Sequence, residues 1–146
     1  MILIINGPNL NLLGQREPKI YGLQTYQTLI DSCIHAANSL GTKVEIKQSN
    51  HEGDIIDFIQ EANNYAKGLI INPAGYSHTS IAILDAMKFL TIPIIEVHLT
   101  DIKKREDFRQ KSLTALAAQE VIMGKGIAGY IEALAKITDY INSELC

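Results

Sequence analysis

The chain has 146 residues, 47% of them hydrophobic, and a formal net charge of −3 at pH 7. This length and hydrophobicity predict one folded domain over residues 1–146 and exclude a disordered chain. The slightly acidic balance argues against binding to nucleic acid or to an anionic membrane. No apolar run approaches the roughly 20 residues that span a bilayer, and the strand pattern at the start predicts no signal peptide. We therefore expect a cytoplasmic protein.

Short apolar runs typical of buried strands alternate with longer stretches of helical periodicity. We expect strands at residues 1–5, 44–46, 68–71, 94–98 and 120–123, and helices at 25–40, 55–66, 76–90 and 127–141. Strands that alternate with helices favour a parallel sheet with helices on both faces. The sequence thus predicts an α/β fold of the flavodoxin-like kind, a three-layer sandwich whose five parallel strands follow the order 2-1-3-4-5.

The segment after the first predicted strand, residues 6–22, is unusually long. A strand is usually joined to the next helix by about 2–6 residues, and much longer connections tend to be functional or disordered. Two prolines and three glycines favour an ordered loop. Further support comes from apolar side chains that can pack, namely Leu10, Leu12, Leu13, Ile20 and Tyr21. We expect residues 14–22 to form a lid that carries one cation, Arg16, and one phenol, Tyr21.

Polar residues follow three of the predicted strands at their carboxyl ends, where open α/β sheets bind ligands. Two of them, Glu96 and His98, lie two positions apart, so their side chains point to one face of a strand. A carboxylate that orients an imidazole favours its protonated form and makes a general acid. The other interpretation is an ordinary, half-buried histidine at the end of a strand, whose hydrogen bonds are satisfied and which has no catalytic role.

Two further groups also have two interpretations. His78, Thr79 and Ser80 lie at a predicted helix start, where such residues bind an anion or simply cap the helix. A guanidinium near a phenol stabilises the phenolate, so Arg16 and Tyr21 are a candidate base. Spacing alone favours a surface arginine and a packing tyrosine.

Other chemistries lack their signatures. The four histidines show no HExxH spacing and the two cysteines no CxxC spacing, which predicts no metal site. The absence of GxGxxG and GxxxxGK[ST] predicts no nucleotide cofactor. Cys33 and Cys146 predict no disulfide framework, with Cys33 a small core residue. Glu106 and Asp107 directly follow residues 103–105, so we expect these three cations to form a solvated face.

Several short motifs occur in a fixed order along nearly the whole chain. They are Asn-Gly-Pro-Asn-Leu at 6–10, Arg-Glu-Pro at 16–18, Ile-Tyr-Gly at 20–22, Gln-Ser-Asn at 48–50, Asn-Pro-Ala-Gly-Tyr-Ser-His-Thr-Ser at 72–80, Glu-Val-His-Leu at 96–99, Arg-Glu-Asp-Phe-Arg at 105–109, and residues 124–130. Together they resemble the type II 3-dehydroquinate dehydratases.

This resemblance implies removal of water from 3-dehydroquinate to give 3-dehydroshikimate through an enolate, with no metal, cofactor or Schiff base. It is the third step of the shikimate route to chorismate. The resemblance makes Tyr21 the base that takes the C2 proton and Arg16 the residue that lowers its pKa. It implies that Asn9 stabilises the developing oxyanion through a water. It also implies that His98, paired with Glu96, protonates the departing C1 hydroxyl.

The resemblance also implies how the substrate is bound and how the chain assembles. Asp85, on the third predicted long helix, is expected to reach into a neighbouring subunit's site in a dodecamer built as a tetramer of trimers. The ring hydroxyls are expected to contact Asn72, His78 and Arg109. The carboxylate is expected to contact Leu99 and Thr100.

Two other hypotheses use the same residues. A flavodoxin-like module could bind a flavin or a phosphorylated ligand at this rim, but the chain lacks a phosphate-binding loop. A structural oligomer with a decayed site conflicts with the presence of every residue type that the reaction needs.

Overall fold

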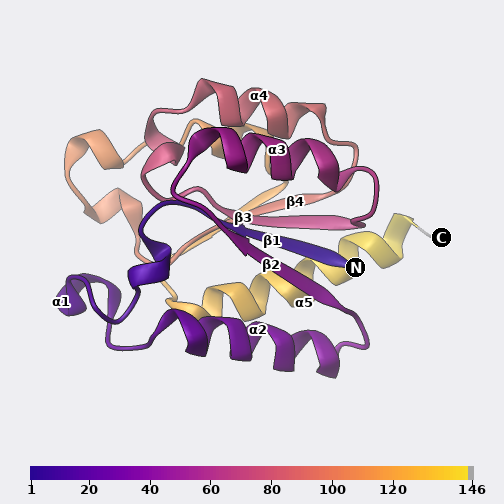
Figure 1. Ribbon diagram of the computed structural model, residues 1–146, viewed down its shortest axis with the longest axis horizontal. Coiled ribbons are helices and arrows are strands. Elements are labelled where there is room, and N and C mark those ends of the chain that lie inside the picture. Colours follow the sequence, from indigo (N-terminus) through magenta and orange to yellow (C-terminus); the bar gives the residue numbers. More distant parts are fainter. Residues whose placement is uncertain (145–146) are drawn as a thin grey trace.

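One sheet of five parallel strands forms the centre of the protein (Figure 1). The computed structural model describes residues 1–144, apart from the side chains of Tyr21 and Glu144, so Cys146 lies outside the described residues. The sheet order β2-β1-β3-β4-β5 confirms the predicted flavodoxin-like fold. The strands are β1 (Ile2–Asn6), β2 (Val44–Gln48), β3 (Gly68–Asn72), β4 (Ile94–His98) and β5 (Glu120–Met123).

Helices cover both faces of the sheet (Figure 1). On one face pack α2 (Tyr26–Ser39) and α5 (Ile127–Glu144), and on the other pack α3 (Glu52–Ala62) and α4 (Ile81–Phe89). This arrangement completes the three layers expected from the alternation of strands and helices. Within the described residues, no helix combines the length and the apolar composition needed to cross a membrane.

The first strand shows why both faces must be covered. Its side chains alternate between the two faces, and all of them are apolar up to Ile5. Ile2 and Ile4 belong to the core beneath α2 and α5, whereas Leu3 and Ile5 belong to the core beneath α3 and α4. A strand with no polar face is stable only between two layers of helices.

Helix boundaries follow local capping more closely than hydrophobic periodicity. The Oγ1 atom of Thr25 accepts a hydrogen bond from the N–H of Thr28 at 3.1 Å, so α2 begins where the sequence predicted. The prediction of a single helix over residues 76–90 is wrong at its start. Residues Ala74–His78 form a 3₁₀ helix, and α4 begins only after Ser80. The Ser80 side chain caps α4 by accepting a hydrogen bond from the N–H of Ile83.

The long segment after β1 contains two short helices that the sequence did not predict. A 3₁₀ helix spans Leu10–Leu12, and α1 spans Pro18–Tyr21 within the expected lid. Leu13 is buried, but Leu12 and Ile20 are 39% and 42% exposed, so the expectation that they pack is wrong. Because α1 lies beside the sheet rather than on it (Figure 1), it has no core face to cover.

Cys33 is a fully buried thiol on α2, as predicted. Burial raises the pKa of this thiol from 9.0 to about 12, and burial also raises the pKa of the Tyr26 and Tyr130 phenols. Above about pH 9 the unfolded chain therefore releases protons that the folded chain retains. The stability associated with these neutral groups is complete below pH 9 and is lost as the pH rises toward 12.

We expect the free energy of unfolding, measured by urea denaturation, to fall by about 1 kcal/mol from Cys33 alone between pH 9 and pH 10. The Cys33→Ala variant should be less stable at pH 7 because it leaves a cavity, but its stability should decline less steeply above pH 9. An equally steep decline in the variant would show that Cys33 does not cause the pH dependence.

Candidate active site

The carboxyl ends of β1, β3 and β4 open into one cavity of about 230 Å³. The strand register places Asn6 of β1 beside Asn72 of β3, so the polar residues that follow these strands reach the same rim. Most of the residues predicted to form a site line this cavity. These are Asn9, Arg16, Asn72, His78, His98, Leu99, Thr100 and Arg109.

The loops after β1 and β3 contact each other closely. The N–H of Gly7 donates to the carbonyl of Asn72 at 2.8 Å, and a Cβ atom at position 7 would lie only 2.5 Å from the Pro73 carbonyl oxygen. Asn9 follows with φ 71°, a left-handed conformation that asparagine tolerates, and its N–H donates to Asn50 Oδ1 at 3.0 Å. Glycine at position 7 therefore brings Asn9 to the cavity beside the end of β3.

A buried hydrogen-bond network fixes the side chain of Asn72. The Oη atom of Tyr130, on α5, accepts from Asn72 Nδ2 at 2.9 Å and donates to Asn6 Oδ1 at 2.7 Å. Asn72 Oδ1 accepts from the N–H of Ala74 at 3.0 Å. Burial raises the pKa of the fully buried Tyr130, so its phenol remains a neutral donor. The amide of Asn72 is thus held in one orientation, with one N–H left to donate.

The carboxylate–histidine pair predicted from the i, i+2 spacing is present on β4. His98 Nε2 lies 2.7 Å from Glu96 Oε2, and the two side chains are 5% and 0% exposed. Glu96 also accepts hydrogen bonds from Ser112 Oγ at 2.6 Å and from Thr114 Oγ1. Because His98 lines the cavity and Glu96 lies behind it, the carboxylate orients the imidazole toward a bound molecule.

His78 reaches the cavity from the 3₁₀ helix that precedes α4. Its Nδ1 atom lies 2.7 Å from the backbone carbonyl oxygen of Lys111. A carbonyl oxygen only accepts, so Nδ1 carries a hydrogen and, in the neutral ring, Nε2 is an acceptor. The function of Ser80, by contrast, is the ordinary capping of α4.

Three guanidinium groups line the cavity, those of Arg16, Arg105 and Arg109, and none of its described lining residues is acidic. Arg105 Nη1 donates to Thr100 Oγ1 at 3.3 Å, and the Arg105 side chain is only 16% exposed. The expectation of a solvated face over residues 103–105 is therefore wrong for Arg105. A short 3₁₀ helix, Ile102–Lys104, ends just before Arg105, and the Arg105 side chain lies at the cavity.

The charge of the cavity is opposite to the net charge of the chain. A cationic hollow on an acidic protein favours a small anion over an extended polyanion such as nucleic acid. The described residues contain no cluster of three His, Cys, Asp or Glu side chains that could hold a metal ion.

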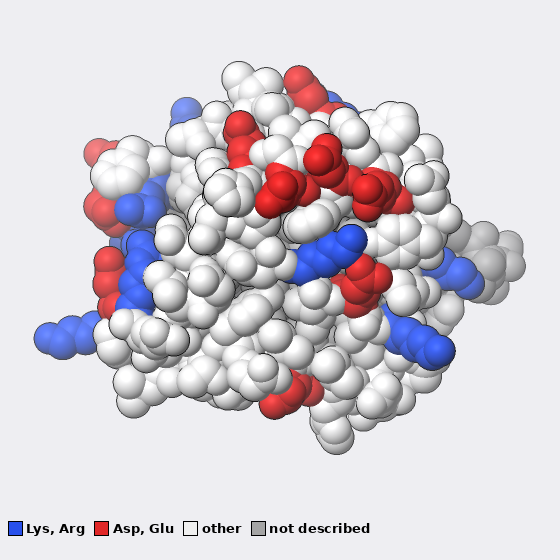
Figure 2. All heavy atoms as spheres, viewed as in Figure 1, with Lys and Arg blue, Asp and Glu red and all other residues white. Residues whose placement is uncertain are grey.

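On the face shown in Figure 2, acidic side chains gather over α3, which carries Glu52, Asp54, Asp57 and Glu61.

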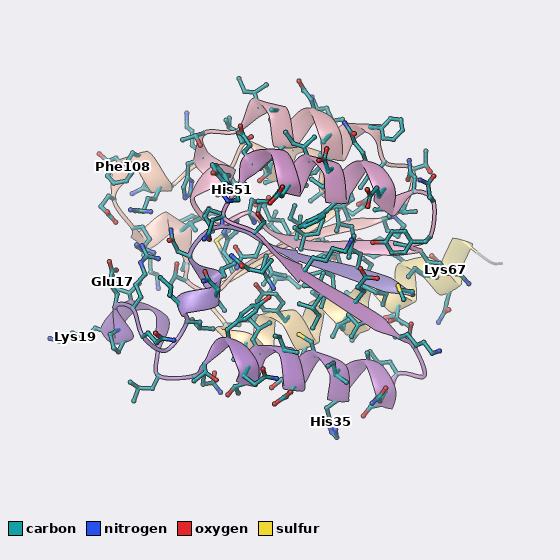
Figure 3. All side chains as sticks on the ribbon, in the orientation of Figure 1. Glu17, Lys19, His35, His51, Lys67 and Phe108 are labelled. Carbon is teal, nitrogen blue, oxygen red and sulfur yellow. The ribbon has the colours of Figure 1, made fainter. Side chains whose placement is uncertain are left out.

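Besides Glu96, which lies behind His98, two predicted site residues are not placed at the cavity. Asp85 lies exposed on α4, in a separate hollow between α3 and α4. Tyr21 ends α1, and its side chain lies outside the described part of the structure. Glu17, which directly precedes α1, and Lys19 within α1 lie at the end of the molecule where Phe108 also lies (Figure 3). The guanidinium of the cavity residue Arg109 lies 4.9 Å from the centre of the Phe108 ring.

Sequence reasoning gave no role to four residues that the structure brings to the site. Arg105 and Tyr130 lie within motifs that were recognised, so the motifs were a signal that could have identified them. Ser112 and Thr114 lie in the long segment between β4 and β5, and no spacing rule indicates that their hydroxyls contact Glu96.

The Tyr130→Phe variant should lose about 1–3 kcal/mol of stability, because Asn6 Oδ1 and Asn72 Nδ2 would be left buried without this partner. Tyr26→Phe is the matched control, since its hydroxyl accepts only one long bond, 3.3 Å from Asn6 Nδ2, and should cost less. Urea denaturation of both variants measures the difference. Equal losses would contradict a special role for the Tyr130 hydroxyl.

The chain is similar to known proteins along nearly its whole length. A family model described as dehydroquinase class II matches residues 1–138. A 3-dehydroquinate dehydratase of Phenylobacterium zucineum is 52% identical over 137 residues, which cover 92% of this chain and 94% of that one. The 3-dehydroquinate dehydratase 1 of Agrobacterium fabrum is 49% identical over 134 residues, 92% of each chain. A crystal structure of type II dehydroquinase from Butyrivibrio crossotus matches with a TM-score of 0.92 and 45% identity, covering 94% of this chain and 96% of that one. The chain therefore belongs to the type II dehydroquinase family.

Proposed function

We propose that this chain is a cytoplasmic 3-dehydroquinate dehydratase that converts 3-dehydroquinate to 3-dehydroshikimate, the third step of the shikimate pathway. The observation that carries the proposal is the composition of the cavity. A buried carboxylate–histidine pair opens onto three guanidinium groups, and no described lining residue is acidic. A cyclic substrate that bears one carboxylate and several hydroxyls matches these cations and the polar groups beside them.

The first chemical step is removal of the C2 proton by the Tyr21 phenolate. Arg16, which lines the cavity five residues before Tyr21, stabilises this phenolate by Coulomb attraction. The electron pair of the C–H bond moves onto the neighbouring ketone and forms an enolate. Asn9 holds a water against the enolate oxygen, so the interaction strengthens as the negative charge develops.

The second step is departure of the C1 hydroxyl. His98 donates a proton to this hydroxyl, which leaves as water, while the enolate electrons form the new C=C bond and restore the ketone. Glu96, 2.7 Å behind the imidazole, stabilises the cation that donates the proton. The described cavity lining contains no lysine, which supports a route without an imine.

The remaining cavity residues hold the ring. The free N–H of Asn72 donates to a ring hydroxyl, and Nε2 of His78 accepts from another. Arg109 contacts a ring hydroxyl too, and its Nε is held 3.1 Å from Glu106 Oε2. The carboxylate binds at Leu99 and Thr100, where the Thr100 hydroxyl already contacts a guanidinium.

Asp85 completes the proposed site from a second subunit. Its exposed position on α4, away from the cavity of its own chain, is the position that a residue contributed to a neighbour needs. We assign the assembly as a dodecamer, a tetramer of trimers.

The activity is tested by adding 3-dehydroquinate to the purified protein and following the ultraviolet absorbance of the conjugated enone product. We expect turnover, and we expect it to persist when borohydride is added with substrate, because no imine forms. Loss of activity only when borohydride and substrate are present together would establish a lysine imine and overturn the mechanism. Absence of turnover would overturn the function and favour the binding-module hypothesis.

The shared site is tested by mixing two inactive variants. Tyr21→Phe and Asp85→Ala should each lower kcat by about 10²-fold or more, because one removes the base and the other a contact from the neighbouring subunit. When the two chains are co-expressed, some sites combine an intact Tyr21 with an intact Asp85, and activity should partly return. No recovery in a mixed oligomer of confirmed composition would show that Asp85 acts within its own chain or not at all.

A further inference from the structure

Residues 111–114, which we call the strap, provide two hydroxyl donors to the buried carboxylate of Glu96, which also contacts His98. Ser112 Oγ donates to Glu96 Oε2 at 2.6 Å, and Thr114 Oγ1 donates to Glu96 Oε1. Thr114 and Glu96 are both 0% exposed. Each carboxylate oxygen therefore has a hydroxyl donor from the strap, and one oxygen has the imidazole as well.

The direction of these bonds is determined by their surroundings. Ser112 Oγ accepts from the N–H of Ala115 at 3.2 Å, so its own hydrogen is available for Glu96. An ionised carboxylate accepts and cannot donate, and it is stable in a buried position only when several donors reach it. The two hydroxyls and the imidazole N–H thus satisfy a charge that water does not reach.

The strap is also anchored to the second histidine of the site. The Lys111 carbonyl accepts from His78 Nδ1 at 2.7 Å, and the Leu113 N–H donates to the Ser77 carbonyl at 2.7 Å. One short segment therefore holds His78 through its backbone and Glu96 through its side chains. Its position is consequently fixed relative to both sides of the cavity.

The charges around His98 show why Glu96 needs this support. The charged or titratable groups that line the cavity with His98 are the guanidiniums of Arg16, Arg105 and Arg109 and the imidazole of His78. None of these can stabilise a protonated His98. In the described structure, Glu96 is the anion in contact with it.

We propose that Ser112 and Thr114 are positioning residues of the dehydration: they hold Glu96 as a carboxylate, and through it they hold His98 with Nε2–H toward Glu96 and Nδ1 toward the substrate. This inference rests on the proposed function, in which His98 protonates the leaving hydroxyl. Without the two hydroxyls, the proton shared by the pair moves toward Glu96, and the imidazole becomes a poorer acid. The loss falls on the chemical step and not on substrate binding.

The test compares Thr114→Val, which keeps the shape of the side chain and removes the hydroxyl, with Thr114→Ser, which keeps the hydroxyl. We expect Thr114→Val to lower kcat by about 10-fold or more with KM changed by less than about 3-fold. Thr114→Ser should recover most of the kcat. The matched control is Thr138→Val, because the Thr138 hydroxyl donates to a backbone carbonyl within α5 and does not line the cavity.

A double-mutant cycle separates positioning from general damage to the fold. If Thr114 acts through His98, Thr114→Val should have little further effect on kcat when it is added to His98→Ala. The proposal is overturned if the full loss persists in that background, or if Thr114→Val and Ser112→Ala both retain kcat within about 2-fold of wild type. If Thr114→Val does not fold, Ser112→Ala carries the same test, since its side chain is only partly buried.

A spectroscopic measurement keeps the inference separate from the proposed function. In the wild type, the His98 Nε2–H bonded to a buried carboxylate should give a slowly exchanging, low-field proton resonance, assigned by its absence from His98→Ala. Thr114→Val should shift or remove this resonance even if the protein does not dehydrate 3-dehydroquinate. An unchanged resonance would overturn the positioning role, whereas absence of turnover in the wild type would overturn the function alone.

Discussion

Burial of polar side chains at the ends of a fully covered sheet is the constraint on which the rest of this structure depends. Asn6, Asn72 and Glu96 are at most 3% exposed, so their hydrogen bonds must come from the protein. The partners come from elements outside the sheet, with Tyr130 on α5 serving both asparagines and the strap serving Glu96. The requirement to satisfy these groups therefore determines the floor of the cavity and the orientation of the side chains that face a ligand.

The part of the fold that depends on local pattern was predictable from the sequence. The order of strands and helices, the sheet order and the bounds of β4 and β5 all follow from apolar runs and their spacing. The Glu96–His98 pair was predictable for the same reason, because a period of two fixes the face of a strand. Helix starts were less predictable. The non-helical backbone of Thr79 and of the capping residue Ser80 splits one expected helix into a 3₁₀ helix and α4.

What could not be predicted from residue spacing depends on contacts between distant parts of the chain. Ser112 and Thr114 are 16 and 18 residues from Glu96, and Tyr130 is 124 residues from Asn6. The direction of Arg105 was missed because charge pattern alone does not show which way a turn points a side chain. The roles proposed for Asn9 and Asp85 rest on the family resemblance, since neither residue has a spacing that indicates chemistry.

The buried thiol of Cys33 has a practical consequence for studying motion in this protein. Thiol reagents attack the thiolate, and the raised pKa together with complete burial leaves almost none accessible at neutral pH while α2 stays on the sheet. The rate at which a peptide containing Cys33 becomes labelled therefore measures how often α2 separates from the core, without an introduced probe. Because α2 directly follows the segment proposed as the lid, comparing this rate with and without a bound ligand reveals how far closure of the site is transmitted into the core.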